Sequence, residues 1–180
     1  GGQTKNVGKT SVVAGLIAAT PEMQWTAFTI TKDEHGAGGS FAVSEELAGA
    51  VGTDSARFLA AGAMRSFWVR GALAEAMPWV REEMARAENA VIESNSILRF
   101  LEPDLYLSVL DPAVEDFKES ARYFLDRADA VLVPEGVLVR PVWTGVSLKL
   151  VAGTPVLAMR PPVYVTAEVV EFVRRRLETV

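Results

Sequence analysis

The sequence predicts an α/β fold in which a mostly parallel central sheet carries helices on both faces. Short apolar segments alternate with longer segments of helical period along the 180 residues, and this alternation is typical of parallel sheets that are covered on both sides. The chain also starts with a glycine-rich turn that leads directly into an apolar helical segment at residues 12–18. A chain of this length is expected to form one domain over residues 1–180.

The elements of the first half follow from hydrophobic period and from the residues that begin or end helices. Pro21 ends the first helix, Thr53 is an N-cap, and Pro78 suits the first turn of a helix. Residues 33–45 are polar and glycine-rich, which predicts a mobile loop. The resulting prediction has helices at residues 9–19, 53–63, 71–77 and 78–87, and strands at residues 25–31, 64–70 and 90–92.

The second half continues the alternation of strands and helices. A helix is predicted at residues 113–127, because Phe117, Ala121, Phe124 and Leu125 share one of its faces. Residues 136–153 have no readable pattern. Strands are predicted at residues 105–110, 131–133 and 155–159, and a closing helix is predicted at residues 166–177.

The composition excludes several classes of function. There is no cysteine, which removes disulfides, thiol catalysis and cysteine-based zinc sites. No segment has the ~20 unbroken apolar residues of a membrane helix, and the start of the chain is too polar for a signal peptide. The formal net charge is −5, without a basic tract of the kind that binds nucleic acid. We therefore expect a cytoplasmic protein with neither a membrane nor a nucleic acid as partner.

The start of the chain carries the clearest chemical signal. It reads GGQTKNVGKTS, in which Gly8-Lys9-Thr10 is the core of the Walker A phosphate-binding signature. Backbone N–H groups of such a loop, together with the positive end of the following helix dipole, bind phosphate oxygens. Lys9 is expected to reach the β- and γ-phosphates and to act in catalysis, and the Thr10 hydroxyl is expected to bind Mg²⁺. The residues expected to contact the nucleotide in this loop are Gly2, Thr4, Asn6, Val7, Gly8, Lys9, Thr10 and Ser11.

The spacing of this loop differs from the common form. Four residues usually separate the first glycine from Gly-Lys, which would require glycine where this chain has Gln3. Gly2 followed by five residues fits a longer loop instead. A buried strand normally precedes such a loop, so we expect a short strand before Gly1.

Polar residues that follow predicted strands are further candidates, because ligands of such folds bind outside the carboxyl ends of strands. Lys32 is expected to bind an anion, and Asp33 is expected to ligate Mg²⁺ and to act in catalysis. Glu93 ends an apolar strand in the Walker B pattern, which predicts a catalytic carboxylate near the Mg²⁺. A solvated loop at residues 32–35 and an ordinary strand end at Glu93 are the alternatives.

Two more residues are assigned to the nucleotide or its substrate. Asp54 lies in the run Gly52-Thr53-Asp54-Ser55, which either contacts the ligand or only caps a helix. Arg160 follows the last predicted strand and is a candidate for the base pocket. No N-K-x-D motif occurs, so the sequence does not distinguish GTP from ATP.

The long loop resembles G-x-x-x-x-x-G-K-T of dethiobiotin synthetase and the loop of the adaptors of molybdopterin-guanine dinucleotide biosynthesis (MobB type), both of the SIMIBI class of P-loop proteins. The resemblance to the adaptors extends to later motifs. Those proteins have K-H-x-H, G-K-D-S and A-G-A where this chain has Lys32-Asp33-Glu34-His35, Gly52-Thr53-Asp54-Ser55 and Ala61-Gly62-Ala63. Glu93 matches the acid of their V-E-G, with Ser94 in place of the glycine.

This resemblance implies a P-loop NTPase fold and a Mg²⁺-dependent protein that binds GTP or ATP and hydrolyses it weakly. It also implies an accessory role in the biosynthesis of a molybdopterin-like cofactor, a homodimer, and either a protein partner or a cofactor substrate. The alternative is a small-molecule kinase or ATP-dependent ligase of the dethiobiotin synthetase type. In that case the Lys32 region and Asn95-Ser96 would hold a small acceptor.

Overall fold

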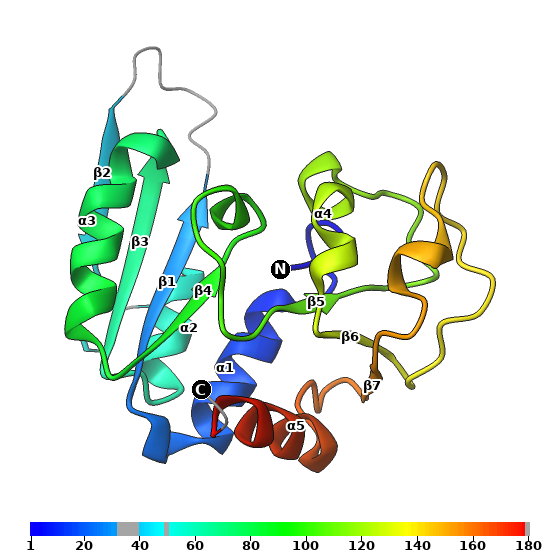
Figure 1. Ribbon diagram of the computed structural model, residues 1–180. Helices are drawn as coiled ribbons and strands as arrows, with labels where there is room; N and C mark the ends of the chain where they lie inside the picture. The colour runs from blue at the N-terminus through cyan, green and yellow to red at the C-terminus, as the bar shows by residue number, and fades with distance from the viewer. Residues whose placement is uncertain (32–39, 49–50, 179–180) are drawn as a thin grey trace. The chain divides into compact units, whose positions relative to one another are not determined.

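A computed structural model describes residues 1–31, 40–48 and 51–178. The chain forms two compact units (Figure 1). The first unit comprises Gly1–Val12 and Glu102–Val180, and the second comprises Val13–Leu101. That residues 1–180 form one domain stays a prediction.

The second unit is built on a four-stranded sheet with the order β2-β3-β1-β4. Its strands are β1 (Trp25–Thr31), β2 (Phe41–Glu45), β3 (Arg65–Gly71) and β4 (Asn89–Glu93). Strand β1 pairs in parallel with β3 and β4, whereas β2 pairs antiparallel with β3 (Figure 1). The sheet is therefore mixed, with β2 at one edge.

Strand β2 corrects the predicted loop at residues 33–45. Phe41–Glu45 is a strand, and residues 33–39 lie outside the described residues. The sequence signal for this strand is weak because β2 is an edge strand whose residues are all exposed or half-buried. Such a strand gains its order from backbone pairing with β3, which requires no apolar period.

Helices cover both faces of this sheet, as predicted. The Ser66 hydroxyl donates a hydrogen bond of 2.7 Å to the carbonyl of Ser55 in helix α2 (Asp54–Ala60). The ring of the next residue, Phe67, packs edge-on against Trp79 of helix α3 (Leu73–Arg86), with ring centroids 5.2 Å apart. Because neighbouring residues of a strand point to opposite faces, α2 and α3 lie on opposite sides of the sheet (Figure 1).

Helix α3 is continuous where two helices were predicted. Leu73–Arg86 is one helix with Pro78 inside it, although proline removes a backbone donor there. Ala76, Met77 and Val80 are buried on both sides of Pro78 along the chain. Their packing holds the two predicted helices as one.

Helix α1 (Lys9–Ala19) has the predicted bounds and passes from the first unit into the second along the chain. Val12, Val13, Leu16 and Ile17 are its buried residues. Within the described part of the chain, no helix combines the length and the apolar character needed to span a membrane.

The first unit contains a three-stranded parallel sheet with the order β5-β6-β7. Its strands are β5 (Leu107–Val109), β6 (Ala130–Pro134) and β7 (Val156–Met159), and its helices are α4 (Glu119–Tyr123) and α5 (Ala167–Leu177). The central strand β6 is buried from Ala130 to Val133. Thr166 caps α5 by accepting a hydrogen bond of 3.4 Å from the Val169 N–H.

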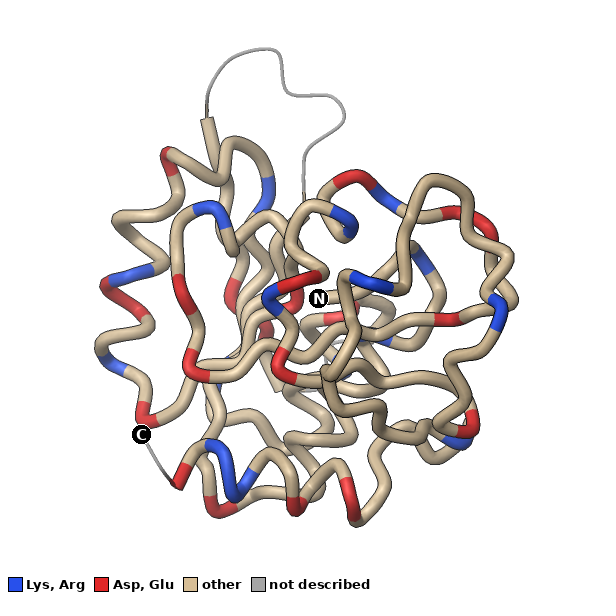
Figure 2. The backbone as a smooth tube through the Cα atoms, turned by 45° about the vertical axis from the view of Figure 1, so that its right-hand side comes forward, with Lys and Arg blue, Asp and Glu red and all other residues tan. Residues whose placement is uncertain are grey.

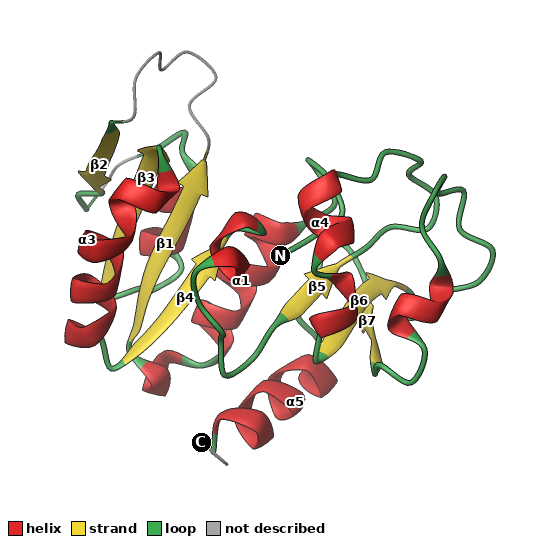
Figure 3. Cartoon of the chain, turned by 45° about the horizontal axis from the view of Figure 1, so that its top comes forward, coloured by secondary structure: helices red, strands yellow, loops and turns green. Residues whose placement is uncertain are grey.

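The α/β class is confirmed, but the strands do not form one central sheet. They form two sheets, one parallel and one mixed (Figure 3). Hydrophobic pattern indicates whether a strand is buried and does not encode which strand pairs with it, so the sequence could not separate the sheets.

Acidic residues accompany the basic ones along the described chain (Figure 2). In α5, for example, Arg175 forms an ion pair of 2.5 Å with Glu171.

Candidate phosphate-binding site

The predicted phosphate-binding loop starts from an extended segment that runs parallel to β5. The Gly1 carbonyl accepts a hydrogen bond of 3.1 Å from the Val109 N–H, and the Gln3 N–H donates one of 2.9 Å to the Val109 carbonyl. The Gly1 ammonium donates to the Leu107 carbonyl at 2.8 Å. Gly2 thereby forms a parallel bridge with Val109. The loop leaves the end of an extended segment and leads into α1, which is the order of elements in a P-loop.

Gln3, which stands where the common loop has glycine, is an anchor. Its side chain is fully buried and its amide has partners on both ends. Nε2 donates to the carbonyls of Val114 and Asp116, at 2.6 and 2.9 Å. Oε1 accepts from the Asp111 N–H at 2.8 Å. One side chain therefore fastens the start of the loop to the segment that follows β5.

These contacts correct the helix that was predicted at residues 113–127. Only Glu119–Tyr123 is α-helical, followed by a single 3₁₀ turn at Leu125–Arg127. In an α-helix, the carbonyls of residues 114 and 116 would accept hydrogen bonds from the N–H groups four residues later. Here both carbonyls accept from the Gln3 side chain instead. A contact across more than a hundred residues thus overrides a local amphipathic pattern.

The side chain of Lys9 is folded back over the loop. Its ammonium donates to the Thr4 carbonyl, and the buried Thr4 hydroxyl donates to the Asp116 carboxylate. The stem of Lys9 lies against Gly2, where an added Cβ atom would be only 2.7 Å from the Lys9 Cγ and Cδ atoms. A side chain at position 2 would therefore displace the Lys9 stem, and its Cβ atom would also lie 3.0 Å from the Val109 carbonyl oxygen.

The loop turns through two residues with positive φ before the helix begins. Asn6 has φ 63° and Gly8 has φ 100°, in the region that favours glycine and tolerates asparagine. The Val12 N–H donates to the Gly8 carbonyl at 2.9 Å. Lys9 and Thr10 are thus the first residues of an 11-residue helix whose first turn contains no acidic residue. The positive end of its dipole is not offset by an acid of that turn.

Tyr164 also contributes to the loop, and sequence reasoning missed it. A Cβ atom added at Gly8 would lie 2.5 Å from the Tyr164 Cε1 atom, so the aromatic ring lies directly against the loop. Tyr164 belongs to the segment that follows β7, which also contains Arg160. Its position after a parallel strand was the signal that could have identified it.

The predicted residues outside the loop have several different settings. Arg160 is exposed at the end of β7 and forms an ion pair of 3.4 Å with Glu135, at the end of β6. Glu93 is the last residue of β4, in register with Thr29 of β1. Lys32 and Asp33 lie outside the described residues.

Asp54 begins α2 in the second unit, where the geometry is that of a helix cap. Thr53 accepts a hydrogen bond of 3.0 Å from the Ala56 N–H, and the Glu46 carboxylate accepts from Thr53 and Ser55 at 2.7 and 2.5 Å. Asp54 is half exposed and lies 3.9 Å from Arg57. The capping alternative therefore accounts for this segment, and a ligand contact by Asp54 stays a prediction.

The metal ligands predicted from the sequence are Thr10, Asp33 and Glu93. Thr10 lies in the first turn of α1, and the described part of the chain contains no group of three or more histidine or acidic side chains that could hold a metal ion. A Mg²⁺ ion bound by one hydroxyl, by water and by substrate phosphates needs no such group. The loop residues are compatible with that mode of binding.

Comparisons with protein-family models, with curated proteins and with solved structures find no match for this chain.

Proposed function

We propose that this protein is a P-loop nucleotide-binding protein that holds the phosphates of GTP or ATP, with Mg²⁺, at residues 2–10. The observation that carries the proposal is the position of Lys9. Its stem lies against Gly2, where a Cβ atom would be 2.7 Å from the Lys9 Cγ and Cδ atoms, and its ammonium donates to a carbonyl of the loop itself. A lysine held inside a glycine-rich turn at a helix start is suited to bind a polyphosphate.

The loop offers phosphate three kinds of favourable contact. The Lys9 ammonium would exchange the Thr4 carbonyl for a phosphate oxygen, which carries more negative charge. The positive end of the α1 dipole, whose first turn contains no acidic residue, would attract the same phosphates. The Thr10 hydroxyl would bind Mg²⁺, and that ion neutralises charge on the phosphates during transfer.

The wider role follows from the resemblance of the motifs. It is that of a slow NTPase that acts as a cytoplasmic accessory protein in the biosynthesis of a molybdopterin-like cofactor, as a homodimer and with a protein partner or cofactor substrate. The Gly8-Lys9-Thr10 core and Glu93 support hydrolysis, and the later motifs support the accessory role. The preference for GTP or ATP has to be measured, because the sequence has no N-K-x-D motif.

The test is calorimetric titration of the protein with Mg-ATP and Mg-GTP. Lys9→Ala removes a charge-assisted contact of about 1.5–3 kcal/mol, so the affinity is expected to fall about 10- to 150-fold. Lys5→Ala is the matched control, because Lys5 carries the same charge in the same loop but is exposed. Equal affinity of wild type and a folded Lys9→Ala would remove the phosphate-binding proposal.

A further inference from the structure

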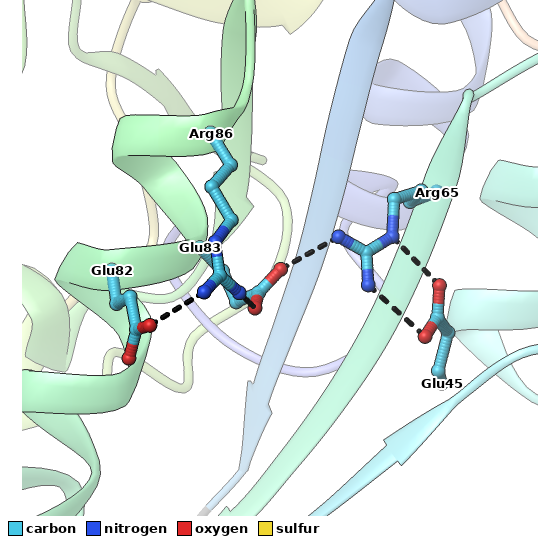
Figure 4. A network of polar contacts seen from close by, with 5 residues as sticks. All are labelled: Glu45, Arg65, Glu82, Glu83 and Arg86. Carbon is cyan, nitrogen blue, oxygen red and sulfur yellow. Dashed lines mark hydrogen bonds and ion pairs between the residues drawn. The ribbon is translucent and has the colours of Figure 1, made fainter.

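Strand β3 carries two arginines that stack on aromatic rings, and among the described residues only one of them has acidic partners. Arg65 lies over the Phe67 ring, 4.6 Å from its centroid, and forms ion pairs with Glu45 at 2.8 Å and Glu83 at 2.7 Å (Figure 4). Arg70 lies over the Trp68 ring, 4.4 Å from its centroid. No ion pair among the described residues includes Arg70.

The guanidinium of Arg70 is held in place although no acid of residues 1–31, 40–48 or 51–178 pairs with it. Its Nη2 donates to the Ser44 hydroxyl at 3.0 Å. The ring beneath it is held too, because the Trp68 indole N–H donates to the Thr31 hydroxyl at 2.9 Å. A guanidinium has five N–H donors, and Ser44 accepts from one of them. The remaining donors belong to a group that is already ordered, which lowers the cost of binding a ligand.

These side chains share one face at the carboxyl end of the sheet. Thr29 is in register with Trp68, and Thr31 is in register with Arg70. Ser44 of β2 is in register with Trp68 on the other side. Paired residues, and residues two apart on a strand, point to the same face. Ligands of parallel α/β sheets bind beyond this end of the strands.

A second, independent observation comes from Thr29 on the same face. Thr29 is 5% exposed, and its hydroxyl has no hydrogen-bond partner among the described residues. Buried hydroxyls almost always have partners, so the missing partner of this one is consistent with a ligand that is absent from the structure. Glu93 is in register with Thr29 on β4, two strands from Arg70 across the sheet, and no ion pair between Glu93 and Arg70 is found among the described residues.

We propose that this face, the Arg70 site (Thr29, Thr31, Ser44, Trp68 and Arg70), binds the oxyanion group of a small ligand. The group is a carboxylate or a phosphate, because the planar fork of a guanidinium matches both. Arg70 supplies the charge and the Thr29 hydroxyl donates a neutral hydrogen bond. The proposal does not rest on nucleotide binding at residues 2–10, and its test contains no nucleotide.

The test uses the full chain labelled with ¹⁵N. The indole N–H resonance of Trp68 is assigned with Trp68→Phe, and the protein is titrated with sodium phosphate and sodium succinate against sodium chloride of equal ionic strength. A saturable shift of the Trp68 resonance with at least one of the two anions, and none with chloride, is expected. A shift of the Trp68 resonance with phosphate alone identifies a phosphate-bearing ligand, and a shift with succinate alone identifies a carboxylate ligand. The shift should persist in Lys9→Ala, which separates this site from the phosphate-binding loop.

Arg70→Gln is expected to weaken the binding at least tenfold. Arg65→Gln is the matched control, since it removes a ring-stacked arginine of the same strand whose charge is already neutralised, and it should retain the shift. If Arg65→Gln does not fold, Arg81→Gln serves as the control, because Arg81 is exposed and, in the described part of the chain, donates only to the Phe100 carbonyl. If Arg70→Gln does not fold, Arg70→Lys keeps the charge without the fork and should still weaken binding.

Thr29→Val removes only the unpartnered hydroxyl and is expected to lower affinity several-fold without loss of folding. Three results would overturn the proposal: no saturable shift with either anion, an equal shift with chloride, or an unchanged shift in folded Arg70→Gln.

Discussion

The Gln3 side-chain amide donates a hydrogen bond of 2.6 Å to the Val114 carbonyl, across 111 residues of sequence. The same amide group also donates to the Asp116 carbonyl, and its oxygen accepts from the Asp111 N–H. The position that carries glycine in shorter phosphate-binding loops is here a buried anchor. The start of the loop and the conformation of residues 111–116 are therefore linked through one side chain.

Gln3→Leu should destabilise the protein strongly. Leucine fills a similar volume but leaves two carbonyls and one N–H without the partner they have now. These groups are only part-buried, so water can replace some of the lost bonds, and we expect a loss of roughly 1–3 kcal/mol in the free energy of unfolding. Urea unfolding measures it, with Lys5→Ala as the exposed control in the same loop. A loss below about 1 kcal/mol would show that Gln3 is not an anchor.

Gly8→Ala should cost more stability than Gly62→Ala. Both glycines have positive φ, 100° and 107°, but a Cβ atom at Gly62 has nothing within 4 Å, whereas at Gly8 it meets Tyr164 at 2.5 Å. Gly62→Ala thus measures the backbone cost alone, roughly 1–2 kcal/mol, and the excess at Gly8 measures the clash.

The double variant Gly8→Ala/Tyr164→Ala checks that assignment. Compared with Tyr164→Ala alone, it should lose only the backbone cost, because the ring is gone. If the excess at Gly8 persisted without the ring, the contact with Tyr164 would not be its cause.

Thr10→Ala should lower Mg²⁺-dependent hydrolysis at least about tenfold, while nucleotide binding measured without Mg²⁺ stays nearly constant. Thr10 is the hydroxyl in the first turn of α1 that is expected to bind the ion. Thr10→Ser retains the hydroxyl and should retain turnover.

Glu93→Gln tests the Walker B prediction in the same hydrolysis assay and should lower turnover. Full turnover in this variant would show that Glu93 is an ordinary strand end.

The pair of Glu45 and Arg65 should contribute to stability only above acidic pH. Hydrogen bonding from Arg65, reinforced by its charge, lowers the pKa of Glu45 below its ordinary value, against a smaller opposing effect of burial. A carboxyl whose pKa is lowered in the folded state stabilises that state above its unfolded pKa, and the contribution is lost as pH falls through the folded pKa. The pair is exposed, so salt should reduce the effect.

Urea unfolding of wild type and Glu45→Gln from pH 7 to pH 3 measures this contribution. The difference in unfolding free energy should be small at pH 7 and should shrink as the pH falls. A difference that grows toward pH 3 would contradict the assignment.

Several elements could be predicted because their determinants are local. Helix α1 has the expected bounds at Lys9 and Ala19, and Pro21 follows its end. Strand β6 is a short apolar run that is buried as its composition indicates. Helix α5 begins after Thr166, whose side chain caps it. In each case the signal lies within a few residues of the element that it determines.

Other features depend on residues far away in the sequence. The edge strand β2 exists because β3 lies beside it, although its own residues form no apolar pattern. Helix α3 continues through Pro78 because buried residues flank it. No spacing rule places Tyr164 against Gly8.

The α/β class and the Gly8-Lys9-Thr10 loop at a helix start could be predicted from the sequence alone, because glycine, lysine and an apolar helical period act over neighbouring residues. Three features depend on tertiary contacts: the division of the strands into two sheets, the use of the carbonyls of residues 114 and 116 by Gln3, and the pairing of Arg65, but not Arg70, with acids among the described residues. Strand pairing, the hydrogen bonds of Gln3 and the ion pairs of Arg65 join groups that are distant in the sequence. They form only when folding brings these groups into contact.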